Sequence, residues 1–432
     1  MNQKRNVLLM GFWATLILSQ SLLKAQDVVS PTDTLARSIH SITDDLSKMK
    51  KLKITGYLQP QWQYIDSAGA PSVAGGDFIN GTSPYFSRVM MRRGRFKFTY
   101  ENNNAIMMIN TDITEKGLFM RETYIRITDP WTKMFSLTAG LLQDQFGFEL
   151  NQSSSERETP ERARYNQTLF PTERDLGIFG TFKAPKTSKF NGLKVDVAMM
   201  NGSAAVASEF DSYKDFTGRI SYNGGTKNEK VLFGIGGSYY YGGYRIGTVK
   251  DYNSVTLPNS DKGFEFASDT ANYNRIARRA YMCVDAQLSL DWVIGITTLR
   301  TEYIVGEQPG TDKTSRSVGA QPTSAIYHRD FDGAYFYFIQ NLGQSKFQVV
   351  AKYDWYDPNI TVSGRDIGKK STNTKVGDIR FDTYTFGATY RFHTNVKLMV
   401  FYDMVTNEST AIKGYTRDIK DNVVTVRMQY KF

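Results

Sequence analysis

The chain has 432 residues, a net charge of +10 and a mean hydropathy of −0.41, and aromatic residues make up 13% of it. An ordinary globular chain of this length divides into two or three domains, but a large barrel avoids that limit because its interior can hold water. The single cysteine, Cys283, excludes an internal disulfide, and the basic charge indicates an anionic partner.

Residues 1–25 are predicted to be an export signal. Lys4 and Arg5 give a basic start, an uncharged apolar run extends from Val7 to Leu18, and Ala25 offers a small residue for cleavage. The run is too short to span a membrane, so an uncleaved anchor helix is the weaker interpretation. Export makes nucleic acid a poor partner and leaves anionic solutes or anionic lipid headgroups.

Residues 26–51 are predicted to be a periplasmic leader with a short helix over residues 34–50, for which Asp33 is the candidate N-cap. Five apolar residues recur there at spacings of four and three: Leu35, Ile39, Ile42, Leu46 and Met49. This seam fits a short coiled coil with other copies, although about two heptads are marginally stable alone. A helix that plugs or packs on the rest of the chain is the other interpretation.

From residue 54 onward the apolar residues recur with the period of two that is typical of a β-strand. In the last segment the apolar residues from Val424 to Phe432 share one face, and the polar residues from Thr425 to Lys431 share the other. Alternation over about nine residues suits a tilted membrane strand with its apolar face toward lipid. The terminal Phe432 resembles the signal that the barrel-insertion machinery reads.

The same alternation predicts an all-β fold, a 16-stranded antiparallel transmembrane β-barrel over residues 52–432 that follows the short periplasmic helix. The strands are expected near 54–65, 87–100, 104–113, 119–128, 134–142, 175–183, 192–200, 214–222, 230–242, 279–291, 294–305, 333–342, 346–356, 381–392, 395–404 and 422–432.

The links between these segments alternate between short and long. Most links on one side run for many residues, at 66–86, 143–174, 243–278, 306–332, 357–380 and 405–421, and two near 114–118 and 201–213 are shorter. Bacterial barrels show this asymmetry, with tight periplasmic turns and long external loops. An even strand count places both termini in the periplasm, and residues 422–432 are expected to pair with 54–65 to close the barrel.

The polar residues that alternate with the lipid-facing ones are expected to line the lumen. Basic residues outnumber acidic ones among them, so the lumen should be mildly positive. The charges either pair across strands to solvate the wall or attract anions. The row Arg93, Arg95 and Lys97 is the best candidate filter, because three like charges on one strand face need partners or anions. The other predicted lumen cations include Arg126, Lys194, Arg219, Arg279, Arg300, Lys352, Arg391, Lys397 and Arg427.

The third external link, residues 143–174, carries many charges of both signs and few apolar anchors. It is either a surface excursion or, as in porin-like barrels, a loop that folds inward and narrows the channel. The candidate constriction residues are Glu156, Arg157, Arg162, Arg164 and Arg174, beside the further acids Glu158, Glu161 and Glu173.

Catalysis finds little support in the sequence. The three histidines, His40, His328 and His393, are expected on the leader helix, an outer loop and a periplasmic turn, so no two should meet. That makes a Ser–His nucleophile or a His-rich metal site improbable. No phosphate-binding glycine motif follows a strand and opens a helix. Gly234, Gly236 and Gly237 lie within a predicted strand and indicate barrel bends or close packing. We therefore expect no enzyme activity, cofactor or metal.

Four stretches, in their order and spacing, resemble the phosphate-selective porin O and P family over roughly residues 52–432. They are Gly56-Tyr57-Leu58-Gln59, Arg92-Arg93-Gly94-Arg95, the segment from Leu137 to Glu149, and Glu173-Arg174-Asp175-Leu176-Gly177. The resemblance implies a trimeric sixteen-stranded barrel with a lumen lined by Arg and Lys. Arg92, Arg93 and Arg95 match its doubled-Arg motif. Asp144 stands where members often carry Lys, which argues against strict phosphate selectivity.

The sequence thus predicts an outer-membrane porin of a Gram-negative bacterium. Small hydrophilic solutes would diffuse passively through its water-filled pore, with a mild preference for anions that include phosphate or other oxyanions. The expected partners are these solutes, outer-membrane lipids, two further copies of the chain and the insertion machinery. The alternatives are a non-selective, sugar or organic-solute porin, and a structural or adhesive barrel. A membrane-embedded enzyme would need a catalytic group at the lipid interface, and none is evident.

Overall fold

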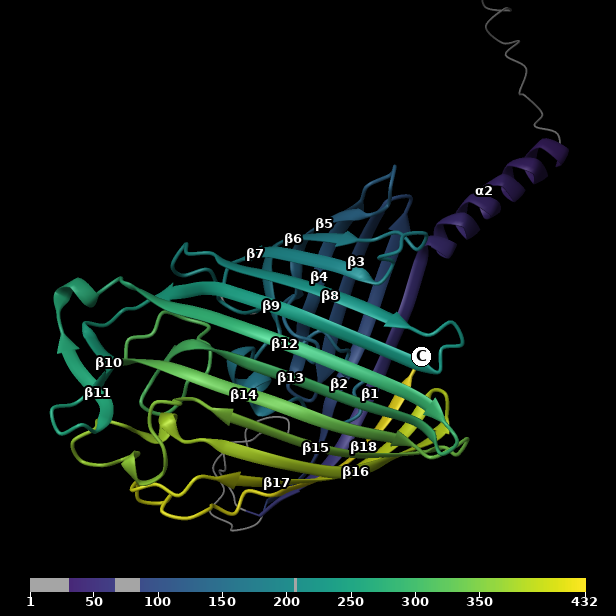
Figure 1. Cartoon of the computed structure of the whole chain (residues 1–432). Coiled ribbons are helices and arrows are strands. Elements are labelled where there is room, and N and C mark those ends of the chain that lie inside the picture. The colour runs from purple at the N-terminus through teal and green to yellow at the C-terminus, as the bar shows by residue number, and fades with distance from the viewer. Residues whose placement is uncertain (1–30, 67–85, 206–207) are drawn as a thin grey trace, which may run out of the picture. The chain divides into compact units, whose positions relative to one another are not determined.

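The computed structural model describes residues 31–66, 86–205 and 208–432 (Figure 1), so the predicted export signal lies outside the described residues. Helix α2 (Pro31–Lys51) confirms the predicted helix but begins three residues earlier. Asp33 therefore lies inside the helix and is not its N-cap, whereas Pro31 suits the first helical turn because its missing N–H would have no partner there. No helix among the described residues is long and apolar enough to cross a membrane.

Residues 53–432 form one compact unit, which is the predicted barrel. Its sheet contains 18 strands, of which β10 and β11 form a hairpin within one loop and the other 16 (18 minus 2) form the barrel. The barrel strands are β1 (Leu52–Ile65), β2 (Phe86–Asn102), β3 (Ala105–Thr114), β4 (Gly117–Thr128), β5 (Phe135–Gln143), β6 (Arg174–Lys183), β7 (Leu193–Met200), β8 (Asp215–Gly225), β9 (Val231–Arg245), β12 (Ile276–Trp292), β13 (Gly295–Gly310), β14 (Ile326–Asn341), β15 (Phe347–Asp357), β16 (Phe381–His393), β17 (Val396–Asn407) and β18 (Val423–Lys431).

The two ends of the sheet meet and close the barrel. β1 pairs antiparallel with β18, from Tyr57 opposite Lys431 to Ile65 opposite Val423. The backbones of Gly56 and Phe432 add two further hydrogen bonds of 3.1 and 3.0 Å. The predicted closure between residues 54–65 and 422–432 is confirmed, and no barrel strand is left with an open edge.

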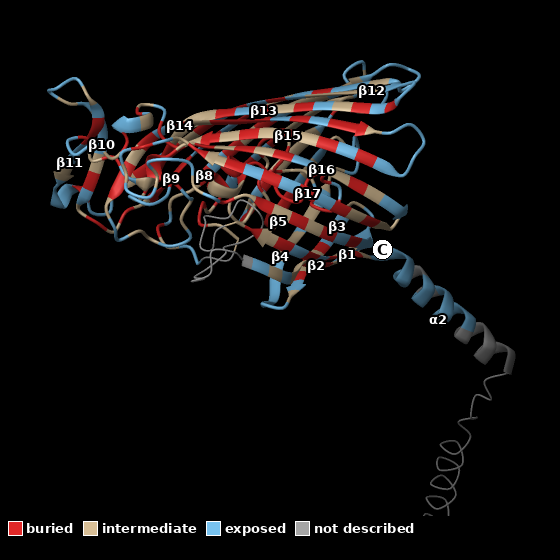
Figure 2. Cartoon of the chain, turned by 90° about the horizontal axis from the view of Figure 1, so that it is seen from below, coloured by how far each residue is buried: buried red, intermediate tan, exposed pale blue. Residues whose placement is uncertain are grey.

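Alternation along the strands separates an inner face from an outer one, which Figure 2 shows as alternating buried and exposed residues. On β12, Tyr281 and Cys283 are 1% and 3% exposed, whereas their neighbours Met282 and Val284 are 62% and 61% exposed. The apolar outer positions are the ones that lipid would cover.

The links confirm the predicted asymmetry. Residues 103–104, 293–294 and 394–395 form two-residue links at one end of the barrel, whereas 144–173 and 358–380 form long loops at the other. Links 115–116 and 201–214 are the short exceptions on the long-loop side. Four long loops recur below: L3 (144–173), L6 (311–325), L7 (358–380) and L8 (408–422).

The structure corrects the sequence outside the membrane band. The link predicted at 243–278 contains the hairpin of β10 (Lys250–Thr256) and β11 (Lys262–Ser268). β14 also begins at Ile326, well before the predicted residue 333, so His328 lies in a strand and not in a loop. Above the lipid a strand keeps its backbone pairing but no longer needs an apolar outer face, so the period of two is lost from the sequence.

Candidate functional site: the loop inside the barrel

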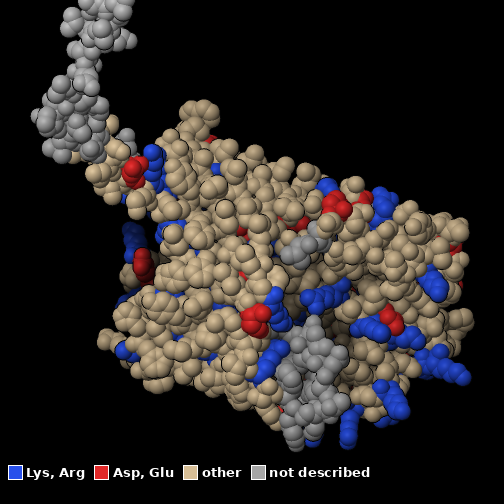
Figure 3. Space-filling view, turned by 180° about the vertical axis from the view of Figure 1, so that it is seen from behind, with Lys and Arg blue, Asp and Glu red and all other residues tan. Residues whose placement is uncertain are grey.

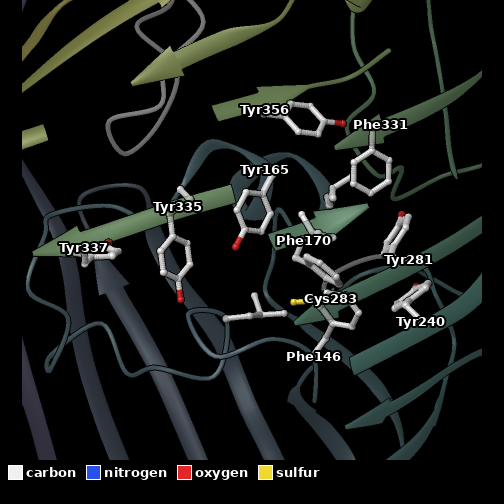
Figure 4. Packing of buried hydrophobic residues seen from close by; sticks show 14 of the residues in the cluster. Phe146, Tyr165, Phe170, Tyr240, Tyr281, Cys283, Phe331, Tyr335, Tyr337 and Tyr356 are labelled. Atoms are coloured by element: carbon white, nitrogen blue, oxygen red, sulfur yellow. The ribbon is translucent and has the colours of Figure 1, made fainter. Parts of the chain in front are cut away.

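L3 folds into the barrel and packs against the inner wall through aromatic side chains (Figure 4). Phe146 lies edge-on to Tyr240 and Tyr281, with ring centroids 6.4 and 6.3 Å apart. Tyr165, on the short helix α3 (Arg164–Leu169), stacks on Tyr335 of β14. The expectation that L3 has few apolar anchors is therefore wrong, and the inward path is the one that the chain adopts.

Two buried carboxylates hold L3 on the same side of the barrel. Glu302 of β13 accepts hydrogen bonds from the Phe148 and Glu149 backbone N–H groups at 2.7 and 3.1 Å, and from the Tyr165 hydroxyl at 2.7 Å. Glu149 in turn accepts from the Tyr337 hydroxyl at 2.8 Å and from the Ala163 N–H at 2.9 Å. These donors replace the water that each carboxylate loses on burial.

L3 also reaches the opposite wall, where β1 and β18 close the barrel. Tyr57 and Gln59 of β1 bond to Ser154 at 2.6 and 3.1 Å. Lys397 of β17 donates to the Ser155 carbonyl at 3.0 Å. Contacts with both walls make L3 a partition across the lumen.

An arginine cluster, defined as Arg92, Arg93, Arg157 and Arg427, surrounds Glu161 at this second wall. Arg92 donates two hydrogen bonds of 3.0 Å to the Glu161 carboxylate, and Arg93 and Arg427 donate at 3.1 and 2.6 Å. Burial alone would raise the pKa of Glu161, but the guanidinium groups outweigh it and hold this pKa well below its ordinary value.

Arg157 completes the cluster without pairing to Glu161. It is 1% exposed, and its Nη2 donates to the Pro160 carbonyl at 3.2 Å. Its Nε and Nη1 have no hydrogen-bond partner among the described residues. Four guanidinium groups thus face one carboxylate, and two buried donor nitrogens remain unused.

The other predicted lumen cations are mostly paired with carboxylates. Arg126 instead donates to the Thr138 hydroxyl at 3.0 Å. Lys97 is exposed and makes no ion pair with any described residue, so only this member of the predicted row is uncompensated. The ion pairs are Arg95–Asp112 at 3.5 Å, Arg219–Asp285 at 2.5 Å, Arg300–Glu158 at 2.9 Å and Lys352–Asp354 at 2.8 Å.

The predicted constriction residues take different positions. Glu156 pairs with Lys431 near the two-residue links, and Arg162 donates to three backbone carbonyls of L3 and pairs with Glu173. Arg174 opens β6 and pairs with Glu122 at 2.7 Å. Arg164 lies in α3 and faces the cavity beside the long loops, whereas Arg162 and Arg174 line a cavity on the side of the short links.

Cavities lie on both sides of L3. One of about 440 Å³ is lined by Arg95, Lys97 and Ser153, and one of about 360 Å³ by Arg126, Lys194 and Arg219, both on the side of the short links. A third, of about 310 Å³, lies between α3 and the long loops. Within the described ranges, no group of three or more His, Cys, Asp or Glu side chains could hold a metal ion.

The outer wall is apolar around its middle. Figure 3 shows Lys and Arg crowding the end with the long loops, whereas uncharged side chains cover most of the wall. Ile125, Leu137 and Phe336 are 57%, 57% and 50% exposed on this surface. Contact of such an apolar band with lipid is favourable, whereas its exposure to water would cost free energy.

Sequence reasoning missed the role of Glu161, which was only one of several acids in L3. The partners of Glu302 were missed as well, because they lie in L3, far from β13 in the sequence. Gly236 gave one usable signal, because a Cβ there would lie 2.6 Å from both Arg219 Nη2 and Asp285 Oδ2. A glycine on the inner face therefore makes room for an ion pair.

The comparisons agree with this geometry. A family model described as phosphate-selective porin O and P matches residues 88–432, so the match begins after the Gly56–Gln59 stretch. No curated protein matches the chain.

Solved structures share the fold at low identity. The channel DcaP of Acinetobacter baumannii is 11% identical, with a TM-score of 0.52 over 88% of this chain and 97% of that one. Salmonella typhi OmpF, in complex with daunomycin, gives the same identity, TM-score and coverage. A loop-deletion mutant of Vibrio cholerae OmpT is 9% identical, with a TM-score of 0.51 over 88% and 99%.

The family match covers most of the chain and coincides with a closed sixteen-stranded barrel that L3 divides. The chain belongs to the phosphate-selective porin O and P family, and it is an outer-membrane porin of a Gram-negative bacterium.

Proposed function

We propose that small hydrophilic solutes diffuse passively through this barrel and that anions pass more readily than cations. The observation that carries the proposal is the arginine cluster, in which four guanidinium groups surround one carboxylate and two Arg157 donors have no partner among the described residues. Unpaired positive charge beside a low-dielectric wall raises the local concentration of anions.

The preference is mild because most of the other lumen charge is balanced. Arg95, Arg219, Arg300 and Lys352 each have a carboxylate partner. Asp144 lies at the start of L3, and burial together with Asp175 raises the pKa of its carboxyl, so it offsets the lumen cations less than an exposed acid would. Phosphate and other oxyanions belong to the favoured class, but this balance does not support strict phosphate selectivity.

The test is the reversal potential across a salt gradient near 0.1 M in planar bilayers, where the Debye length is about 10 Å. Wild type should prefer anions. Arg157→Gln should reduce the ratio of anion to cation permeability roughly fivefold, for an interaction of about 1 kcal/mol. It removes a charge that holds no carboxylate, so the barrel should stay intact.

Lys186→Gln is the matched control, because it removes one charge from an exposed residue in the link between β6 and β7. Its reversal potential should equal that of wild type. Cation preference in wild type, or equal shifts in both variants, would contradict the proposal. Equal permeability to both ions would favour the non-selective or sugar porin instead.

We also propose that three copies assemble and that the α2 seam supports the assembly. The four seam residues whose side chains are described, Ile39, Ile42, Leu46 and Met49, are each more than half exposed. Apolar side chains in that pattern are stabilised when a second helix covers them. Phe432, which ends the closing strand β18, is the residue that we propose the insertion machinery reads.

A further inference from the structure

The third cavity lies on the long-loop side of L3. Arg164, Gln167 and Thr168 of the L3 helix form one side of it. Residues of L6, L7 and L8, together with Tyr356 of β15 and Phe381 of β16, form the rest, and its volume is about 310 Å³. That volume lies at the lower end of the range for small-molecule sites.

Arg164 offers charge with unused donors. It is 8% exposed, its guanidinium carbon lies 4.0 Å from the centre of the Phe381 ring, and its backbone N–H donates to Asp354 at 2.9 Å. Its Nε and Nη2 are buried without a partner in the described chain. The guanidinium is therefore held in place by stacking, while two nitrogens stay available to an acceptor.

Among the residues that the structure describes, the lining has no acidic side chain, and its other charges are also positive. Lys313 and Arg316 of L6 line the cavity and are exposed. Asp421, Asp354 and Asp382 lie close enough to raise the pKa of Arg164 against the lowering effect of burial, but among the described residues none of them lines the cavity or forms an ion pair with the Arg164 guanidinium. A cavity whose charged lining residues are all positive favours an anionic ligand.

The remaining lining is apolar. Ile379 and Phe381 are 1% and 8% exposed and belong to a buried cluster that L7 forms with the ends of β16 and β17. Val376 and Tyr415 pack against the same cluster and also line the cavity. An inorganic anion could accept the same hydrogen bonds from Arg164, but it would lose hydration against this apolar surface without gaining any apolar contact.

We propose that this cavity binds an organic monocarboxylate with an apolar body, its carboxylate on Arg164 and its body against Ile379, Phe381 and Tyr415. The inference rests on the proposed anion pathway and narrows its solutes to one chemical class. A charge-assisted pair with a planar guanidinium orients the carboxylate, and each buried CH₂ group adds about fourfold in affinity.

In the experiment, the full-length protein in detergent is titrated with phenylacetate, acetate and inorganic phosphate in turn, and calorimetry measures the affinity for each. Phenylacetate should bind at least about tenfold more tightly than either of the others. Arg164→Gln should weaken phenylacetate about tenfold or more, because one charge-assisted hydrogen bond is lost. Arg365→Gln, an exposed arginine of L7 outside the cavity, should leave the affinity unchanged.

A second variant guards against misfolding of Arg164→Gln. Arg316→Gln alters an exposed residue and should weaken phenylacetate by about two- to threefold, as expected for a solvated charge. Phosphate binding as tightly as phenylacetate, or equal losses in Arg164→Gln and Arg365→Gln, would overturn the inference. Tighter binding of free phenylalanine would overturn it in favour of a zwitterion site.

The two proposals fail separately. If the channel prefers anions in bilayers but does not bind phenylacetate, the carboxylate-site proposal is wrong and the proposed function still holds. If the protein binds phenylacetate but the channel prefers cations, the arginine cluster does not act as an anion filter and the carboxylate site is still supported.

Discussion

Asp421 shows how one buried residue can link solute binding to pH. It is 2% exposed, and both of its carboxylate oxygens lack a partner in the described part of the chain. Burial raises the pKa of Asp421 to about 7, against the lowering effect of Arg164 and with the support of Asp418 and Asp66. Its negative charge therefore develops near neutral pH, close to the carboxylate site.

We predict that phenylacetate binds more tightly at pH 6 than at pH 8, by about three- to tenfold. A raised pKa keeps Asp421 neutral below 7 and charged above it, so the repulsion of an anionic ligand increases as pH rises. Arg164 stays cationic throughout, because burial lowers its pKa only to about 10. Calorimetry at pH 6, 7 and 8 measures the effect.

Asp421→Asn is the control for this prediction, since it removes the charge and keeps the size. Its affinity should be independent of pH and close to the wild-type value at pH 6. An equal pH dependence in Asp421→Asn would assign the effect to another group.

At the scale of elements, the strands were predictable and the path of L3 was not. A strand such as β18 was predictable from its sequence, because its successive residues face lipid and lumen in turn and therefore need opposite polarity. L3 is held by contacts between distant segments, such as Phe146 with Tyr281 and Tyr165 with Tyr335, and no local pattern encodes those. The charges of L3 were visible in the sequence, but their partners were not.

Gly147 is the residue on which the attachment of L3 depends most sharply. Its φ is +59°, and a Cβ there would lie 2.5 Å from Glu302 Oε1. Gly147→Ala should therefore strain the backbone and displace the carboxylate that holds Phe148, Glu149 and Tyr165. We predict a loss of about 1–3 kcal/mol in the free energy of L3 attachment and a larger, noisier single-channel conductance.

Gly343→Ala separates strain from displacement. Gly343 has a similar φ of +54°, but a Cβ there would meet nothing within 4 Å. Gly343→Ala should lose only the stability that alanine costs at a positive φ, and it should keep the wild-type conductance. If Gly147→Ala conducts like Gly343→Ala, then Glu302 does not anchor L3.

For the whole molecule, barrel closure brings together residues that the sequence separates widely. Arg427 and Glu161 are 266 positions apart and lie 2.6 Å apart, because β18 closes on β1 while L3 crosses the lumen. The alternation in the sequence predicted most inward-facing residues, and the mildly positive lumen stays a prediction. The alternation could not pair these residues, since pairing depends on register, on the shear of the barrel and on the loop inside.

The last prediction concerns assembly through α2. Its seam of about two heptads is too short to associate stably on its own. Barrels that already contact one another would hold three helices at high effective concentration, and the helices would then add stability to the trimer.

Ile42→Asp with Leu46→Asp places charges in that seam. His40→Asp with Ser41→Asp adds the same charge on exposed residues off the seam. Light scattering in detergent with rising temperature should show the seam variant, and a chain without residues 26–50, dissociating to monomers well before wild type. The off-seam variant should follow wild type. If deleting residues 26–50 leaves both the mass and its temperature dependence unchanged, the helix is a spacer and the barrel surfaces alone hold the assembly.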